Sequence, residues 1–122
     1  MGGILWRVAV VPAHSDVLVD RTGTLTVATT DPTTHTVYLS ESLSGAFLAR
    51  VVVHELGHCA MVSFGLISEI RRLVPPGNWV EMEEFCCNFI ADYGYTIYSD
   101  AYHILGQEAL YIVPEFIEKF VA

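Results

Sequence analysis

The sequence is poor in basic residues. Of its 122 residues, 6 are Lys or Arg and 14 are Asp or Glu, so the formal net charge is −8 at pH 7. Phosphate backbones and anionic lipid surfaces repel a protein of this charge. We therefore expect neither a nucleic-acid partner nor a membrane partner.

Cysteines and long apolar runs are also scarce. The 3 cysteines are an odd number, and residues 1–7 lack the basic and apolar regions of a secretory signal. This combination favours reduced thiols in a cytoplasmic protein over a disulfide framework. No uninterrupted apolar run reaches the roughly eighteen residues of a membrane span, so the sequence predicts a soluble protein.

The length and the order of patterns bound the architecture. A chain of 122 residues with 52% hydrophobic content can bury one core but hardly two, which predicts a single domain over residues 1–122. In its N-terminal third, turn residues separate four short runs rich in β-branched residues: 4–11, 16–20, 24–29 and 36–40. Helical patterns follow, with short packing helices expected at 67–73 and 113–120. This order predicts an α+β fold with a mixed or antiparallel sheet of three to four strands.

The segment His54 to His58 reads HELGH and fits the HExxH pattern. Residues four apart share one face of a helix, so His54 and His58 can bind one metal ion while Glu55 stands beside it. The surrounding residues, 44–64, are apolar on almost every side, which predicts a buried central helix that stops at Gly65. Three polar side chains in such a helix need partners. Backbone carbonyls are one solution, but the spacing favours a metal ion.

A metal ion held by protein needs at least three ligands, and a second helix supplies candidates for the third. Asn78 and Glu81 form a capping-box pattern, which predicts a helix from Asn78 to Gly94 or beyond. Glu81, Glu83 and Glu84 are rival ligands at its start, although acids at a helix N-terminus are often only solvated. The pattern also predicts that Phe85 and Phe89 face the core. The three thiols, Cys59, Cys86 and Cys87, are weaker candidates because small buried thiols usually fill the core.

Both helices together resemble a known family. HELGH at 54–58, followed by Glu84, Asn88, Phe89 and Ala91, resembles the gluzincin branch of zinc metallopeptidases, most closely the compact ImmA/IrrE-like metallopeptidases of phages and bacteria. The resemblance covers roughly residues 36–92 and implies a zincin-like fold with Zn²⁺ held by His54, His58 and Glu84. It also implies that Asn88 orients a ligand histidine. Cys87 stands where such proteins often have Ala, and no helix-turn-helix segment accompanies the domain.

The resemblance also implies an activity. Zinc held in this way would lower the pKa of a bound water toward 7 and polarise a substrate carbonyl, and Glu55 would be the general base. The strand at 36–40 would edge the cleft and pair with an extended peptide. We therefore expect a zinc metallopeptidase that acts on a cytosolic protein or peptide in a bacterial or phage-infected cell. The alternative is a zincin-fold binding or structural protein whose zinc shapes or stabilises a peptide-binding cleft without turnover.

Other histidines and tyrosines have less defined roles. Hydrogen-bond donors to the oxyanion could come from a group downstream of the second helix, although aromatic packing explains these residues equally well: Tyr95, Tyr98, Tyr102 and His103. His14 and His35 fall in expected loops, where an exposed histidine is the usual outcome.

Overall fold

The computed structural model of the chain describes residues 1–112. The chain divides into two compact units, Met1–Asp92 and Tyr93–Ala122. All residues of the predicted metal site belong to the first unit. The single domain expected over residues 1–122 stays a prediction, and the helix expected at 113–120 lies outside the described residues.

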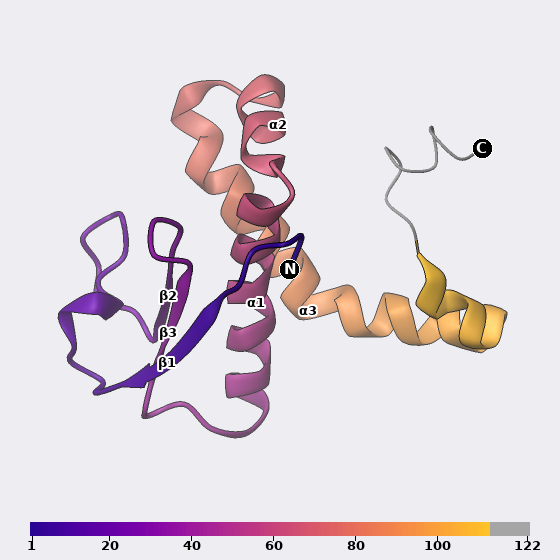
Figure 1. Ribbon diagram of the computed structural model, residues 1–122, viewed down its shortest axis with the longest axis horizontal. Helices are drawn as coiled ribbons and strands as arrows, with labels where there is room; N and C mark the ends of the chain where they lie inside the picture. The colour runs from indigo at the N-terminus through magenta and orange to yellow at the C-terminus, as the bar shows by residue number, and fades with distance from the viewer. Residues whose placement is uncertain (113–122) are drawn as a thin grey trace. The chain divides into compact units, whose positions relative to one another are not determined.

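The first unit contains a small mixed sheet (Figure 1). Its strands are β1 (Arg7–Val11), β2 (Ala28–Asp31) and β3 (Thr36–Ser40), in the spatial order β1-β3-β2. β3 pairs with β1 in parallel and with β2 in antiparallel fashion. With the helices that follow, this confirms the predicted α+β class and a sheet of three strands.

Two of the expected strands are wrong or shifted. Residues Asp16–Leu18 form the 3-10 helix η1, and the run expected at 24–29 enters the sheet only at Ala28. In the first run Leu18 is fully buried, and the pairing is limited to one isolated antiparallel bridge between Val19 and Leu25. The carbonyl of Leu18 accepts two hydrogen bonds from Thr26, one from its backbone N–H and one from its hydroxyl, so a local bridge satisfies this backbone rather than a strand of the main sheet.

The strand expected to edge the cleft is instead the centre of the sheet. β3 is paired along both sides, and four of its five residues are buried. The edge strands are β1 and β2. The periodicity of residues 36–40 predicted the strand correctly. The order in which strands pair depends on contacts between segments distant in sequence, so the pattern of one strand does not predict it.

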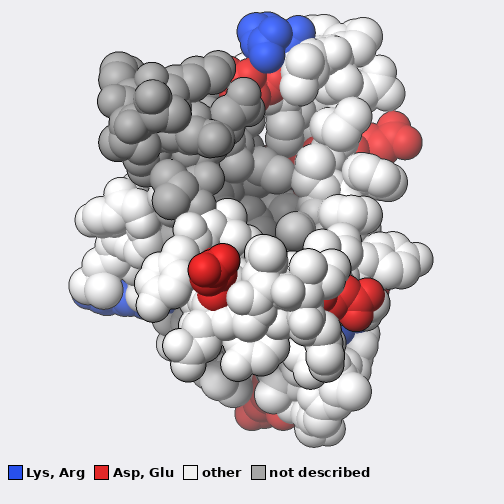
Figure 2. Space-filling view, turned by 90° about the vertical axis from the view of Figure 1, so that its right-hand side faces the viewer, with Lys and Arg blue, Asp and Glu red and all other residues white. Residues whose placement is uncertain are grey.

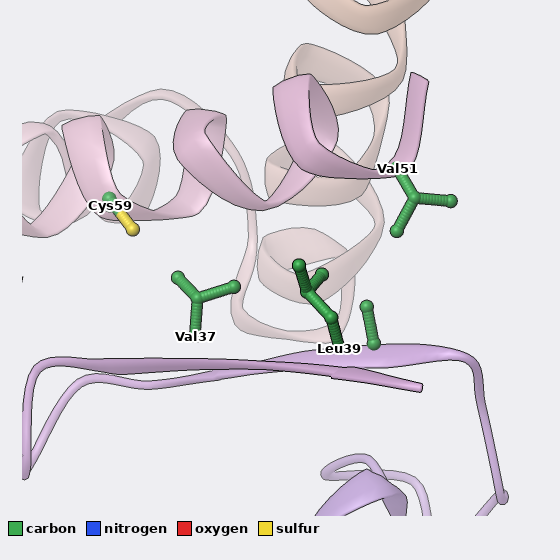
Figure 3. Close-up of a cluster of buried hydrophobic side chains, with 5 residues drawn as sticks. Val37, Leu39, Val51 and Cys59 are labelled. Carbon is green, nitrogen blue, oxygen red and sulfur yellow. The ribbon is translucent and has the colours of Figure 1, made fainter. Parts of the chain in front are cut away.

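Helix α1 (Gly45–Ser63) packs on one face of the sheet. Val51 and Cys59 point down to Val37 and Leu39, and these side chains form the core with Ala28 (Figure 3). The helix ends as predicted, because Gly65 adopts the left-handed conformation with φ 68°. The three buried residues of α1 are Val51, Glu55 and Cys59, so the expectation of burial on all sides is wrong.

Helix α1 also has a composition that bears on membranes. By length and composition alone it could cross one, but core helices of soluble proteins pass the same test. Val51 and Cys59 pack against the strands, and Glu55 accepts a hydrogen bond from Thr30 of β2. These contacts are typical of a core helix.

After α2 (Leu66–Leu73) and the short 3-10 helix η2 (Pro76–Asn78), the long helix α3 (Trp79–Leu105) begins. The expected capping box is wrong in detail, because the Asn78 side chain lies 3.4 Å from the Glu81 carboxylate rather than on a backbone N–H. Phe85 and Phe89 are 64% and 44% exposed, so the expectation that they face the core is wrong too. The buried residues of α3 are Glu83 and Cys87, two positions before each phenylalanine and therefore on a different side of the helix.

The second unit holds the C-terminal part of α3 and the 3-10 helix η3 (Gly106–Tyr111). The hydroxyl of Tyr98 donates to the carbonyl of Ala109 at 2.6 Å, and Ala109 is buried. Figure 2 shows one face of the protein, on which most of the described side chains are neither acidic nor basic.

Candidate metal centre and cleft

Helices α1 and α3 approach each other closely at Gly57. A Cβ atom added to Gly57 would lie 3.0 Å from Sγ of Cys87 and 3.3 Å from its Cα. A larger residue at position 57 would therefore push α3 away. Glu83 and Glu84 lie one turn before Cys87, so this approach brings them to the histidines of α1.

Two imidazole nitrogens and one carboxylate converge beside this crossing. Nε2 of His54 lies 3.2 Å from Nε2 of His58 and 3.1 Å from Oε2 of Glu84, and Nε2 of His58 lies 3.3 Å from Oε1 of Glu84. Ligands at about 2.0–2.1 Å from one tetrahedral zinc ion lie roughly 3.3 Å from one another. The donor types and their separations therefore fit a zinc ion, and the three residues are a cluster able to hold a metal.

The geometry separates the three rival glutamates. Glu84 reaches both histidines, whereas Glu81 is exposed and lies beside Asn78. Glu83 reaches the far side of a ring, since its Oε2 lies 3.0 Å from Nδ1 of His58. A carboxylate on the second nitrogen of a ligand histidine fixes the ring and its tautomer. The sequence offered Glu83 only as a rival ligand, and nothing in a run of neighbouring acids distinguishes this role.

The electrostatics of the site follow from these contacts. Burial lowers the pKa of His58, but its hydrogen bonds to Cys87, Glu83 and Glu84 outweigh burial and raise the pKa from 6.5 to about 12. Hydrogen bonds from His54 and His58 hold the pKa of Glu84 well below its usual 4.5. Burial raises the pKa of Glu83, but the hydrogen bond from His58 and other contacts lower it overall. Without a metal ion, these groups form a proton-bearing network.

Arg21 adds a cation to this network. Its guanidinium contacts the carboxylate of Glu83 and lies 3.1 Å from Oε1 of Glu84. Arg21 belongs to the loop between η1 and β2, where the Asp20 carboxylate accepts backbone hydrogen bonds from Thr22 and Thr24. The sequence predicted only a turn here and not this contact, because Arg21 is separated from Glu83 by 62 positions and from Glu84 by 63 positions in the sequence.

The buried carboxylate of Glu55 has a partner that the sequence did not indicate. Glu55 is 6% exposed, and Oγ1 of Thr30 donates a hydrogen bond to its Oε2 at 2.5 Å. Thr30 lies on the edge strand β2, so the sheet holds one oxygen of this carboxylate. The other oxygen, Oε1, has no hydrogen-bond partner within residues 1–112, and Glu55 lines the open cleft described below.

Asn88 does not reach a histidine ring. Its Oδ1 accepts a hydrogen bond from Nη2 of Arg50 at 3.2 Å, and Arg50 also pairs with Asp92 at 2.6 Å. Nδ1 of His54 is buried and, among the described residues, without a hydrogen-bond partner. The role expected for Asn88 is thus not supported by its contacts, because Arg50 of α1 engages the amide instead.

The remaining candidates are not among the three converging groups, although Cys87 contacts His58. Cys59 and Cys87 are fully buried, and burial raises the pKa of Cys59 to about 11, so they suit the core better than a thiolate site. His14 is exposed as expected, but His35 is half-buried and packs edge-on against Trp6. The four oxyanion candidates belong to the second unit: Tyr95, Tyr98, Tyr102 and His103.

An open cleft of about 1020 Å³ runs along α1 beside the cluster. One face of α1 lines it from Phe47 to Val62, and β2, the Arg21 loop, α2 and the start of α3 line it as well. Within the first unit, no tyrosine lines this cleft.

The arrangement therefore brings together three features: a candidate site for a divalent metal ion, a buried carboxylate and a cleft open to a ligand. Comparison of the chain with family models, with curated proteins and with solved structures gave no match. Its function is inferred from these residues alone.

Proposed function

We propose that the protein is a zinc-dependent metallopeptidase of the zincin type, with Zn²⁺ held by His54, His58 and Glu84. The observation that carries the proposal is the convergence of two imidazole nitrogens of α1 and the carboxylate of Glu84 on α3, with each nitrogen 3.1–3.3 Å from the other nitrogen and from one oxygen of the carboxylate. The HELGH sequence supports it, because a site that only stabilises a fold has no need of the carboxylate of Glu55 beside its ligands.

The residues of the chain divide the work of peptide hydrolysis. Zinc, when bound, lowers the pKa of water and polarises a carbonyl oxygen. Glu55 takes a proton from the attacking water and delivers it to the amine nitrogen as the C–N bond breaks. Thr30 holds Oε2 of Glu55, so that Oε1 can accept that proton. Glu83 fixes the ring of His58 through Nδ1.

The cleft favours a peptide or protein substrate. The face of α1 from Phe47 to Val62 spans about 22 Å, at 1.5 Å per residue. This length accommodates roughly six or seven residues of extended chain. Strand β2 is an edge strand that lines the cleft, so its backbone groups can pair with such a chain. In this proposal β2 takes the role that the sequence assigned to residues 36–40.

Metal content and peptide cleavage, measured together, test the proposal. We expect Glu55→Gln to keep one zinc ion per chain and to lose at least a hundredfold of the cleavage rate, because the neutral amide cannot accept a proton. His54→Ala and Glu84→Ala should lose both zinc and cleavage. Glu81→Gln is the matched control and should keep both, because Glu81 contacts Asn78 instead. Full cleavage by Glu55→Gln would overturn the mechanism.

A zincin-fold binding protein without turnover is the second candidate. One observation favours it: within the first unit no tyrosine lines the cleft, and the histidines of that unit that do so are the proposed ligands. An oxyanion donor contributes about a hundredfold or more to the rate in hydrolases of this kind. A wild-type protein that binds zinc and peptides but cleaves none of a broad peptide library would favour this candidate.

A further inference from the structure

Three arginines line the cleft, which is half of the 6 basic residues of the chain. Two of them have carboxylate partners: Arg21 contacts the two glutamates of α3, and Arg50 pairs with Asp92. The third, Arg71 of α2, has no carboxylate partner among residues 1–112. Its neighbour Arg72 pairs with Glu69 at 2.8 Å and does not line the cleft.

Arg71 is held in place without the use of its hydrogen-bond donors. Its guanidinium lies 5.0 Å above the ring of Trp79, a cation–π contact. The indole is itself fixed, because its Nε1 donates to the carbonyl of Val74 at 3.0 Å. Among residues 1–112 the N–H groups of Arg71 have no acceptor, and two N–H groups of a guanidinium match the two oxygens of a carboxylate.

The surroundings of Arg71 strengthen an interaction with an anion. Aliphatic side chains also line the same cleft, among them Val62, Val80 and Ile67, which lies one turn before Arg71 on α2. Arg71 itself is exposed, and a bound peptide that covers it against this apolar lining would lower the local dielectric constant and strengthen an ion pair. Val62 follows His58 by one turn on α1, so the aliphatic lining continues from the proposed metal site toward the C-terminal end of this helix.

We propose that Arg71 is a binding subsite for a carboxylate of the peptide substrate, either an acidic side chain or the C-terminal carboxylate. The inference rests on the proposed function, because it assigns a substrate class to the same cleft. The net charge of −8 opposes acidic peptides in general. The preference is therefore for one carboxylate at one position, not for acidic peptides as a class.

Peptide binding tests the inference without reliance on cleavage. Zinc-loaded Glu55→Gln protein is titrated with fluorescent heptapeptides, and anisotropy gives the dissociation constants. The series moves a single Glu, or Gln in its place, along a neutral sequence, and each peptide is made with a free or an amidated C-terminus. We expect one carboxylate position to bind about tenfold more tightly than its neutral counterpart. If the preference is lost when Gln replaces Glu in the peptide, the bound carboxylate is a side chain. If it is lost when the peptide is amidated, the bound carboxylate is the C-terminus.

Variants of the two neighbouring arginines complete the test. Arg71→Met should abolish the preference, Arg71→Lys should retain part of it, and Arg72→Met should leave it unchanged. Two outcomes would overturn the inference: a protein with Arg71 intact that binds all peptides equally, Glu or Gln, free or amidated, or a preference that persists in Arg71→Met. Cleavage by the wild type without a preference for an acid also overturns it and leaves the proposed function intact. An Arg71-dependent preference in a protein that cleaves nothing supports the subsite and contradicts the proposed peptidase.

Discussion

At the scale of single residues, Thr30 links the sheet to the proposed chemistry. We expect Thr30→Val, which keeps the shape but removes the hydroxyl, to lower kcat about tenfold with little change in KM, because Glu55 loses the hydrogen bond that holds its Oε2. Thr30→Ser should retain most of the rate. Steady-state kinetics and zinc content measured on the same samples check this result. A valine variant with wild-type kcat would show that Thr30 has no positioning role.

Gly57 sets the distance between α1 and α3. Alanine at an exposed helix position would stabilise the protein by up to about 1 kcal/mol, but a Cβ here meets Cys87 at 3.0 and 3.3 Å, and overpacking costs about 1–3 kcal/mol. We expect Gly57→Ala to lower the free energy of unfolding by about 1 kcal/mol and to weaken zinc binding. Urea unfolding and a zinc competition titration measure both effects.

The thiol of Cys87 provides the control for this substitution. In a Cys87→Ala background the 3.0 Å contact with Sγ is gone, so Gly57→Ala should cost less than in the wild type. If the two substitutions were additive in urea unfolding, the crossing of α1 and α3 would not be the cause of the destabilisation.

The sequence predicts some site residues better than others. His54, Glu55 and His58 lie within one turn and a half of one helix, so local periodicity alone brings them together. Glu81, Glu83 and Glu84 share one helical turn as well, and only the approach of Cys87 to Gly57 distinguishes them. Arg71 and Thr30 reach the cleft from separate elements, and no local pattern marks such residues.

At the scale of elements, the contacts between α1 and α3 predict how stability depends on pH. In the presence of a chelator, the raised pKa of His58 contributes stability that is complete below pH 6.5 and is lost as the pH rises toward about 12. The lowered pKa values of Glu83 and Glu84 contribute stability that is present above pH 4.5 and is lost as the pH falls. We therefore expect the highest melting temperature between about pH 4.5 and about pH 6.5.

Zinc should reverse this trend above neutrality. A metal ion must displace a proton from the histidine pair, so its affinity should rise about tenfold per pH unit for each proton released. Melting curves with chelator and with zinc, from about pH 5 to about pH 9, measure both trends. A chelated protein that becomes more stable from pH 6.5 upward would contradict the network between His58 and the two glutamates.

The elements themselves were predictable where their signal is local. The α1 stop at Gly65, the α2 segment and the β3 strand follow from turn residues and periodicity, and the structure has them at the expected places. The order β1-β3-β2 does not follow, because pairing depends on contacts distant in sequence. The η1 segment was misread because burial of Leu18 mimics one inward-facing strand position.

At the scale of the whole molecule, the proposed zinc ion would cross-link two helices of the first unit. A ligand present at a hundred times its dissociation constant stabilises the folded state by about 2.7 kcal/mol, which for a chain of this size raises Tm by on the order of 10 °C. We expect such a shift on addition of zinc to the wild type. His54→Ala and Glu84→Ala should each show almost none, although their ligands lie on different helices. A full shift in either variant would place the metal elsewhere.

The burial of Cys59 and Cys87 determines which cysteines oxidants can modify in the folded protein. Both thiols are inaccessible, whereas Cys86 is half-buried on the helix that carries Cys87. Electrophiles and peroxides therefore encounter one cysteine in the native protein, and the other two become reactive only when the packing around α1 and α3 opens. Cys86 and Cys87 therefore differ in reactivity although they are adjacent. Modification of Cys87 identifies molecules in which α1 and α3 have separated transiently.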